Sequence, residues 1–117
     1  MKIRKIQELL SANVLTCADR LDTDVHSACG SDMMSDVLAY VKDQAVLMTG
    51  LVNMQVVRTA EMMDMVCIVF VRSKKPTDDI LALAEQNGIV ILTTDLRMYD
   101  ACGILYAGGL QGASANG

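Results

Sequence analysis

The sequence has little that would recognise nucleic acid. It contains no tryptophan and one phenylalanine among 117 residues, so it offers no set of aromatic side chains on which bases could stack. Its formal net charge is −4 and its pI is about 4.7, which gives no electrostatic attraction to a phosphate backbone. We therefore expect no nucleic-acid partner.

Long apolar runs and a secretory leader are also missing. The mean hydropathy is +0.33, yet the longest purely apolar run, residues 65–71, has 7 members, far below the roughly 18 that span a bilayer. Strands of a sheet covered on both faces explain this hydropathy better than a membrane. The first ten residues carry charges throughout and lack an apolar segment before a small-residue cleavage site. We expect a cytoplasmic protein with no membrane partner.

Local metal and catalytic motifs are absent as well. Four cysteines, Cys17, Cys29, Cys67 and Cys102, lie far apart with no CxxC spacing, so we expect reduced cysteines that pack as small apolar side chains, with no metal or cofactor. No phosphate-binding loop, GxGxxG, HExxH or GxSxG occurs. The only histidine, His26, has no motif-placed nucleophile near it. These absences favour a protein that is not an enzyme.

The most informative stretch is residues 49–72. A Thr49-Gly50 turn precedes an amphipathic helix over residues 52–65, and an apolar run over 66–71 follows it. That run does not alternate with polar residues, which is typical of a strand buried on both faces. The helix places four apolar residues on one stripe that should face the sheet, namely Val52, Val56, Ala60 and Met63.

Similar patterns place the other elements. Further strands are predicted at residues 14–18, 25–29, 45–49 and 89–93, and further helices at 2–11, 32–41, 77–87 and 96–107. We expect Ser31 or Asp32 to cap the second helix and Asp95 to cap the last. The first two strands, if they pair, should be antiparallel because their connection is short. The inward face of the last helix is predicted to hold Met98, Tyr99, Cys102 and Leu105.

Alternation of strands and helices beyond residue 24 predicts an α/β fold. We expect a three-layer α/β/α sandwich with a mixed, mainly parallel five-stranded sheet. A single domain should span residues 1–107. Residues 108–117 have no core-forming pattern and are predicted to be a disordered C-terminal tail.

Ligands of open α/β sheets collect beyond the carboxyl ends of strands, where helix N-termini present free amides. Two predicted turns lie at such ends, and polar side chains follow them. A phosphate, carboxylate or nucleotide could bind there, although the same residues also serve as ordinary helix caps and Asp32 would compete with an anion. The candidate ligand-binding residues are Gly30, Ser31, Asp32, Thr49, Gly50, Asn53, Arg58 and Arg72.

The outer face of the 52–65 helix is unusually apolar for a surface that meets only water. Methionine suits an adaptable protein–protein surface, and charged residues lie between the apolar ones. We predict a homodimer through this face, with another part of the same chain covering it as the alternative. The predicted interface residues are Met54, Val57, Arg58, Glu61, Met62 and Met65.

Four sequence segments together resemble the DRTGG domain family, in particular its small stand-alone bacterial members. They are SDMMSDVLAYV, TGLVNMQVVRTAEMMDM, CIVFVRSKKP and GIVILTTDLRMYDACGILY. The resemblance covers residues 1–107 and implies a fold similar to the N-terminal domain of HPr kinase/phosphatase. The kinase domain with its phosphate-binding loop is not present in this chain. The letters DRTGG do not occur either, and the nearest string is Val57-Arg58-Thr59-Ala60.

The resemblance implies a regulatory or ligand-sensing role, because the family also occurs joined to CBS domains. It further implies an association with hydrogenase-like and iron–sulfur proteins. We therefore expect a non-enzymatic regulatory domain that binds a small ligand, a nucleotide or another anion, and is accessory to a redox or hydrogenase-like system. The alternative is an iron–sulfur-binding accessory protein of a hydrogenase-like enzyme.

Overall fold

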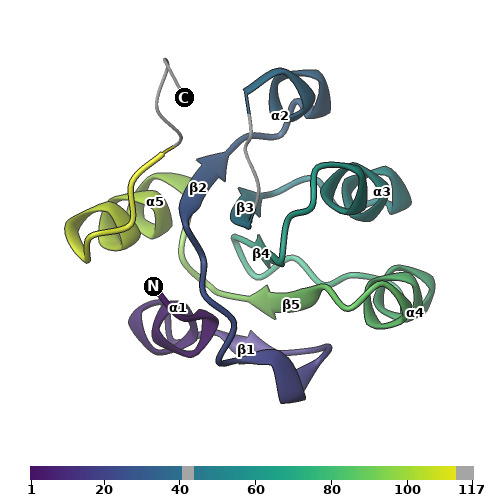
Figure 1. Ribbon diagram of the computed structural model, residues 1–117, viewed down its shortest axis with the longest axis horizontal. Coiled ribbons are helices and arrows are strands. Elements are labelled where there is room, and N and C mark those ends of the chain that lie inside the picture. The colour runs from purple at the N-terminus through teal and green to yellow at the C-terminus, as the bar shows by residue number, and fades with distance from the viewer. Residues whose placement is uncertain (41–43, 113–117) are drawn as a thin grey trace.

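The computed structural model describes residues 1–40 and 44–112 as a five-stranded sheet between two layers of helices (Figure 1). The strand order is β1-β5-β4-β3-β2. Strands β2 to β5 are mutually parallel, and β1 pairs antiparallel with β5. The strands are β1 (Asn13–Val14), β2 (Ser27–Gly30), β3 (Ala45–Thr49), β4 (Cys67–Phe70) and β5 (Val90–Thr93).

Helices cover both faces of this sheet. On one face lie α1 (Ile3–Leu9) and α5 (Met98–Ala107), and on the other lie α2, α3 and α4 (Figure 1). The last three are α2 (Met34–Tyr40), α3 (Met54–Met62) and α4 (Asp78–Gln86). The predicted three-layer α/β/α sandwich is confirmed. No helix of the described ranges is long and apolar enough to cross a membrane.

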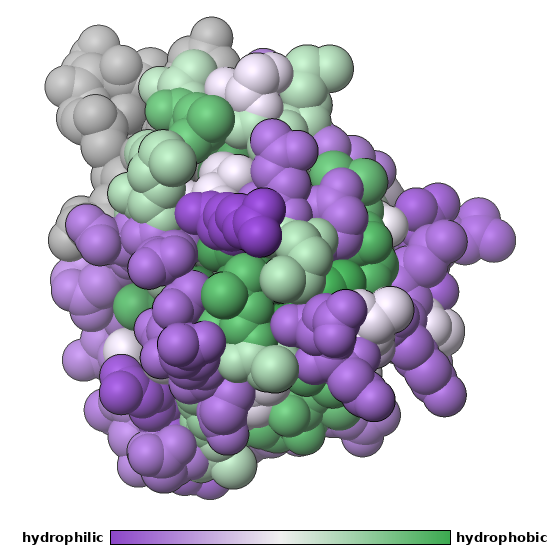
Figure 2. All heavy atoms as spheres, turned by 90° about the vertical axis from the view of Figure 1, so that its right-hand side faces the viewer, coloured by the Kyte–Doolittle hydropathy of each residue, from purple (hydrophilic) through white to green (hydrophobic). Residues whose placement is uncertain are grey.

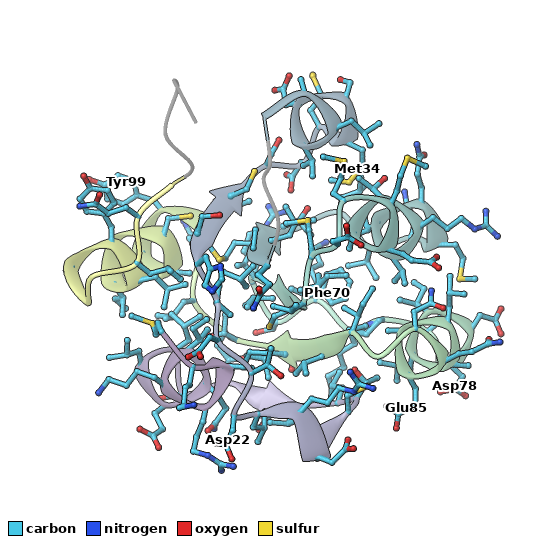
Figure 3. All side chains as sticks on the ribbon, viewed as in Figure 1. Asp22, Met34, Phe70, Asp78, Glu85 and Tyr99 are labelled. Carbon is cyan, nitrogen blue, oxygen red and sulfur yellow. The ribbon has the colours of Figure 1, made fainter. Side chains whose placement is uncertain are left out.

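Strand β4 lies at the centre of the sheet, and its sequence explains why. Each of its four residues is fully buried. Successive side chains of a strand point to opposite faces, so Cys67 and Val69 join the core under α1 and α5, whereas Ile68 and Phe70 join the core under α2, α3 and α4. Phe70 is labelled in Figure 3. A strand with an apolar core on both sides needs apolar residues at every position.

The first two predicted strands differ from the observed ones. Strand β1 has two residues instead of the predicted 14–18, and it lies beside β5, at the opposite edge of the sheet from β2. The segment between them crosses from one edge to the other (Figure 1). The ladder stops early because the Thr16 hydroxyl donates to Ile89 O (2.7 Å) and accepts from Ile91 N (2.8 Å), replacing backbone pairing.

The end of the chain also differs from the expectation of a tail that is disordered from residue 108. Leu110 is buried in the core under α1 and α5, and Gln111 O accepts a hydrogen bond from Ala28 N on β2 (3.0 Å). One apolar side chain and one edge hydrogen bond thus attach residues 110 and 111 to the rest of the domain. Residues 113–117, and the Val41 position expected inside α2, lie outside the described ranges.

Two predicted helix faces need correction. Tyr99 is 88% exposed, and Ala101 is buried against the sheet in its place. Val57 on α3 and Met65 just beyond it are buried, so the predicted outer face does not carry four exposed apolar side chains. The reason is that α3 packs between α2 and α4, which cover its flanks. Met62 stays 71% exposed, and hydrophilic residues are spread across this side of the molecule (Figure 2).

Candidate functional site

The loops that follow the four parallel strands lie along the carboxyl edge of the sheet, which is the border formed by the C-terminal ends of these strands. Because β2, β3, β4 and β5 are neighbours in space, the segments after residues 30, 49, 70 and 93 lie in that order along the edge. The turns after β2 and β3 are thus brought together, as the sequence predicts. The loops after β4 and β5 extend the same edge.

Asp32 fills the position at the end of β3 where an anion was expected. Its Oδ1 accepts hydrogen bonds from Gly50 N (2.7 Å) and from the Thr49 hydroxyl (2.9 Å). The Gly50 amide, the Thr49 hydroxyl and the nearby positive charge of Arg72 lower the pKa of Asp32 below its usual value. An internal carboxylate therefore already occupies the amide donor of the Thr49-Gly50 turn, and this amide is not free for an external anion.

Arg72 reaches back over the same turn. Its guanidinium lies against Gly50, where an added Cβ would collide with Nη2 and lie 3.2 Å from Cζ. Arg72 and Ser73 both have left-handed backbones, with φ of 59° and 57°. Non-glycine residues rarely adopt this conformation, and two in succession cost free energy that the surroundings must offset.

Two backbone hydrogen bonds to the loop after β5 offset that cost. Arg72 N donates to Leu96 O (2.7 Å), and Ser73 N donates to Thr94 O (2.9 Å). They lock the loop after β4 onto the loop after β5, and the left-handed pair turns the chain so that Arg72 lies over β3. The strained residues thus place a cation at the centre of the carboxyl edge.

A cleft of about 550 Å³ opens beside Arg72, lined also by Ser73, Asp95 and Arg97. The Ser73 hydroxyl donates to Asp95 Oδ1 (2.6 Å). Asp95 does not cap α5 as predicted, because the chain runs two residues further and Arg97 takes the N-cap position. The lining therefore combines two guanidinium groups with one carboxylate and one hydroxyl.

The other predicted ligand residues do not line this cleft. Asn53 caps α3, its side-chain oxygen accepting from Val56 N (3.1 Å). Arg58 is exposed on α3, and Ser31 Oγ accepts from Met33 N (2.9 Å) at the start of α2. His26 is exposed and contributes a backbone N–H to Gln44 O. Of the predicted residues, Arg72 alone is in the cleft.

Sequence reasoning missed Ser73, Asp95 and Arg97. Part of the signal was available, because residues 66–71 and 89–93 were both predicted as strands of the mainly parallel sheet. The structure makes these strands neighbours, so the polar residues just beyond them, RS at 72–73 and DLR at 95–97, lie at the same end of the sheet.

The four cysteines are free thiols, and Cys102 lies close to Cys29, because a Cβ added at the adjacent Gly30 would lie 2.7 Å from Cys102 Sγ. Burial raises the pKa of the thiols of Cys29, Cys67 and Cys102. Cys17 has a pKa of about 11, raised by burial and by the neighbouring carboxylate of Glu85. Within residues 1–40 and 44–112, no three His, Cys, Asp or Glu side chains are grouped as ligands for a metal ion.

Comparison with known proteins identifies the family. The model of the DRTGG domain matches residues 5–107. The chain belongs to the DRTGG domain family. The crystal structure of the CBS and DRTGG domains from the regulatory region of Clostridium perfringens pyrophosphatase, in complex with the activator diadenosine tetraphosphate, is similar to this DRTGG domain with a TM-score of 0.72 and 15% identity.

That similarity covers 89% of the present chain and 45% of the neighbour's, so the chain spans less than half the neighbour's length. At this identity the likeness shows the fold. No curated protein matches this chain significantly.

Proposed function

We propose that this DRTGG domain is a non-enzymatic regulatory module that binds a phosphorylated small molecule, with a nucleotide as the preferred class. The observation that carries the proposal is the cleft lined by Arg72 and Arg97. Two guanidinium groups can bind phosphate oxygens through charge-assisted, bidentate hydrogen bonds. Within the described residues neither arginine forms an ion pair with a carboxylate, so both are available for a ligand.

Asp95 supports a nucleotide over a bare anion. A carboxylate beside two arginines repels part of an anion but accepts hydrogen bonds from hydroxyl groups. One of its oxygens is taken by Ser73, and the other can accept from a ribose. A ligand with both phosphate and sugar hydroxyls matches this lining. The diadenosine tetraphosphate in the related regulatory region is a ligand of that class.

The proposal moves the binding site along the edge from the one expected from the sequence. The turns at Gly30-Ser31-Asp32 and Thr49-Gly50 lie outside the cleft and hold Arg72 in place, because Asp32 accepts from the Gly50 amide and the Arg72 guanidinium lies against Gly50. Asn53 acts as a cap of α3, and Arg58 has no part in the site.

Two further predictions belong to the same proposal. The chain acts as a homodimer, as the sequence analysis predicts. An accessory role beside a redox or hydrogenase-like protein follows from the family resemblance alone. Among residues 1–40 and 44–112, no three His, Cys, Asp or Glu side chains are grouped to support the iron–sulfur alternative. Regulation through a bound small ligand remains our preferred function.

A thermal-shift screen tests the proposal. The probes are inorganic phosphate, AMP, ATP and diadenosine tetraphosphate, each measured against wild type and an Arg72→Gln, Arg97→Gln double variant. A nucleotide at about 100 times its Kd should stabilise the wild type by about 2.7 kcal/mol, a shift in Tm of several degrees. The double variant should show no shift.

Arg58→Gln is the matched control, because it removes one exposed arginine of α3 outside the cleft. It should respond like the wild type. The proposal fails if no phosphorylated probe stabilises the wild type, or if the double variant responds as strongly as the wild type.

A further inference from the structure

A second hollow, of about 260 Å³, borders the cleft that holds Arg72 and Arg97. It lies between the end of α1, the loop after β5 and α5, on the face of the sheet that these two helices cover (Figure 1). Asp95 lines both the hollow and the cleft. Among the described residues that line the hollow, Asp95 is the one that carries a charge, so the hollow differs in chemistry from the cleft beside it.

The hollow has an apolar wall, which consists of Leu9, Leu10, Leu96 and Ile104. Leu10 is buried in the core under α1 and α5, and the other three are half-buried and pack against that core. Their inner sides are therefore fixed by core packing, while their remaining surface lines the hollow. Sites for small molecules combine such a preformed apolar surface with a few polar groups.

The same hydrogen bonds fix the apolar wall and the cations of the cleft relative to each other. Arg72 N donates to Leu96 O (2.7 Å), and Ser73 N donates to Thr94 O (2.9 Å). The Thr94 hydroxyl in turn donates to Leu10 O (2.8 Å) at the end of α1. The loop after β5 is thus tied to the cleft on one side and to α1 on the other, so both hollows belong to one rigid surface.

We propose that this hollow binds the base of the nucleotide whose phosphates bind Arg72 and Arg97. The groups follow one another in the same order on the protein and on the ligand. Guanidinium groups match the phosphates, Asp95 matches the ribose hydroxyls, and the apolar wall matches the faces of the ring. The hydroxyl of Ser11, an exposed residue of the lining, can hydrogen-bond to the polar edge of the base.

The size of the two hollows also suits a nucleotide. The cleft measures about 550 Å³ and the adjoining hollow about 260 Å³, and sites for small molecules measure about 300–1,000 Å³. A phosphate chain or a phosphorylated sugar would leave the apolar wall in contact with water. The inference rests on the proposed function and names the residues that make its site prefer a nucleotide over other phosphorylated compounds.

Isothermal titration with ATP and with inorganic tripolyphosphate tests the inference, because tripolyphosphate offers phosphates without a sugar or a base. The wild type should bind ATP about 10-fold more tightly, since the base buries apolar surface. Charge alone would not give this order, because tripolyphosphate is at least as negative as the triphosphate of ATP. The comparison uses the wild type and therefore does not depend on the folding of any variant.

Ile104→Gln places a polar amide in the apolar wall. It should weaken ATP binding about 5-fold and change tripolyphosphate binding by less than about 2-fold. Leu96→Gln is a second variant of the wall with the same expected result. Retained binding of tripolyphosphate shows that each variant is folded. Tyr106→Gln is the matched control on α5, since Tyr106 is 63% exposed and lines neither hollow, and it should bind both ligands like the wild type.

Three results would overturn the inference while leaving the proposed function intact. They are a wild type that binds tripolyphosphate at least as tightly as ATP, wall variants that bind ATP like the wild type, and wall variants that weaken both ligands equally. In each of these cases Arg72→Gln would still weaken both ligands. A wild type that binds neither ligand would overturn the inference together with the proposed function.

Discussion

The guanidinium of Arg72 lies on the backbone of Gly50, one strand away in the sheet. This contact joins the end of β4 to the end of β3, and it exists because Gly50 has no side chain and Arg72 has a left-handed backbone. Asp32, bonded to the same Gly50 amide, adds a negative charge close by. The position of the cation in the cleft thus depends on three neighbouring strands.

Replacing Gly50 by alanine should move Arg72 without unfolding the protein. The new methyl group collides with Nη2, so the guanidinium has to leave its place. We expect nucleotide affinity to fall about 10-fold while Tm changes by a few degrees at most, because the Gly50 backbone itself is not left-handed and alanine reduces the entropy of the unfolded chain. Gly112→Ala is the control, since its added Cβ makes an ordinary contact of 3.6 Å with Ala28 O. Unchanged affinity in Gly50→Ala would show that Arg72 does not bind the ligand.

Asp32 should contribute a pH-dependent part of the stability. Its folded pKa is lowered, so its contribution is present above the unfolded value of 3.8 and is lost as the pH falls through the folded pKa. Asp32→Asn should lower the free energy of unfolding at pH 7 by about 1 kcal/mol, because the charged acceptor of two hydrogen bonds is replaced by a neutral one. Urea denaturation from pH 7 to pH 2 should show this difference shrinking below pH 4. A constant difference over that range would contradict the assignment.

Cys17 should contribute in the opposite pH range. Its thiol donates to Glu85 Oε2 (2.7 Å), and its backbone N–H donates to the same oxygen (2.7 Å). The pKa is raised from 9.0 to about 11, so the contribution is complete below pH 9 and is lost as the pH rises through 11. Between pH 8 and 11 the wild type should lose on the order of 1 kcal/mol more than Cys17→Ser, whose hydroxyl does not titrate there. Equal losses in the two proteins would contradict a Cys17 pKa that burial and the Glu85 carboxylate raise in the folded protein.

Most of the fold could be predicted because its information is local. Residues 45–48 and 67–70 are apolar at every position and are buried on both faces, and the helix between them has a clear apolar stripe. The pairing of β1 was missed for a non-local reason. The hydroxyl of Thr16 makes the hydrogen bonds to residues 89 and 91 that a strand backbone would otherwise make. The pattern of residues 14–18 does not predict these hydrogen bonds.

The structure brings the predicted turns to the carboxyl edge of the sheet, as expected, but of the predicted ligand residues only Arg72 lines the cleft. The general rule that ligands lie beyond strand ends identified Gly50 and Arg72. It could not show that Asp32 would occupy the amide, or that Arg72 would adopt φ of 59° and extend toward β3. Tyr99 was predicted to face inward, because α5 is apolar on both sides and the sequence pattern of this helix does not distinguish the buried face from the exposed one. Side-chain packing against α1 and β3 decides them.

Isothermal titration with diadenosine tetraphosphate and with ATP is the most direct test of the central claim, that Arg72 and Arg97 bind a phosphorylated ligand. It should compare wild type with Arg72→Gln, Arg97→Gln and Arg58→Gln. We predict that at least one of the two nucleotides binds the wild type. Each cleft variant should lose about 10-fold or more in affinity, since a charge-assisted hydrogen bond to phosphate contributes about 1.5–3 kcal/mol. Arg58→Gln should bind like the wild type. Equal affinities in all four proteins, or no binding of either nucleotide to the wild type, would contradict the claim.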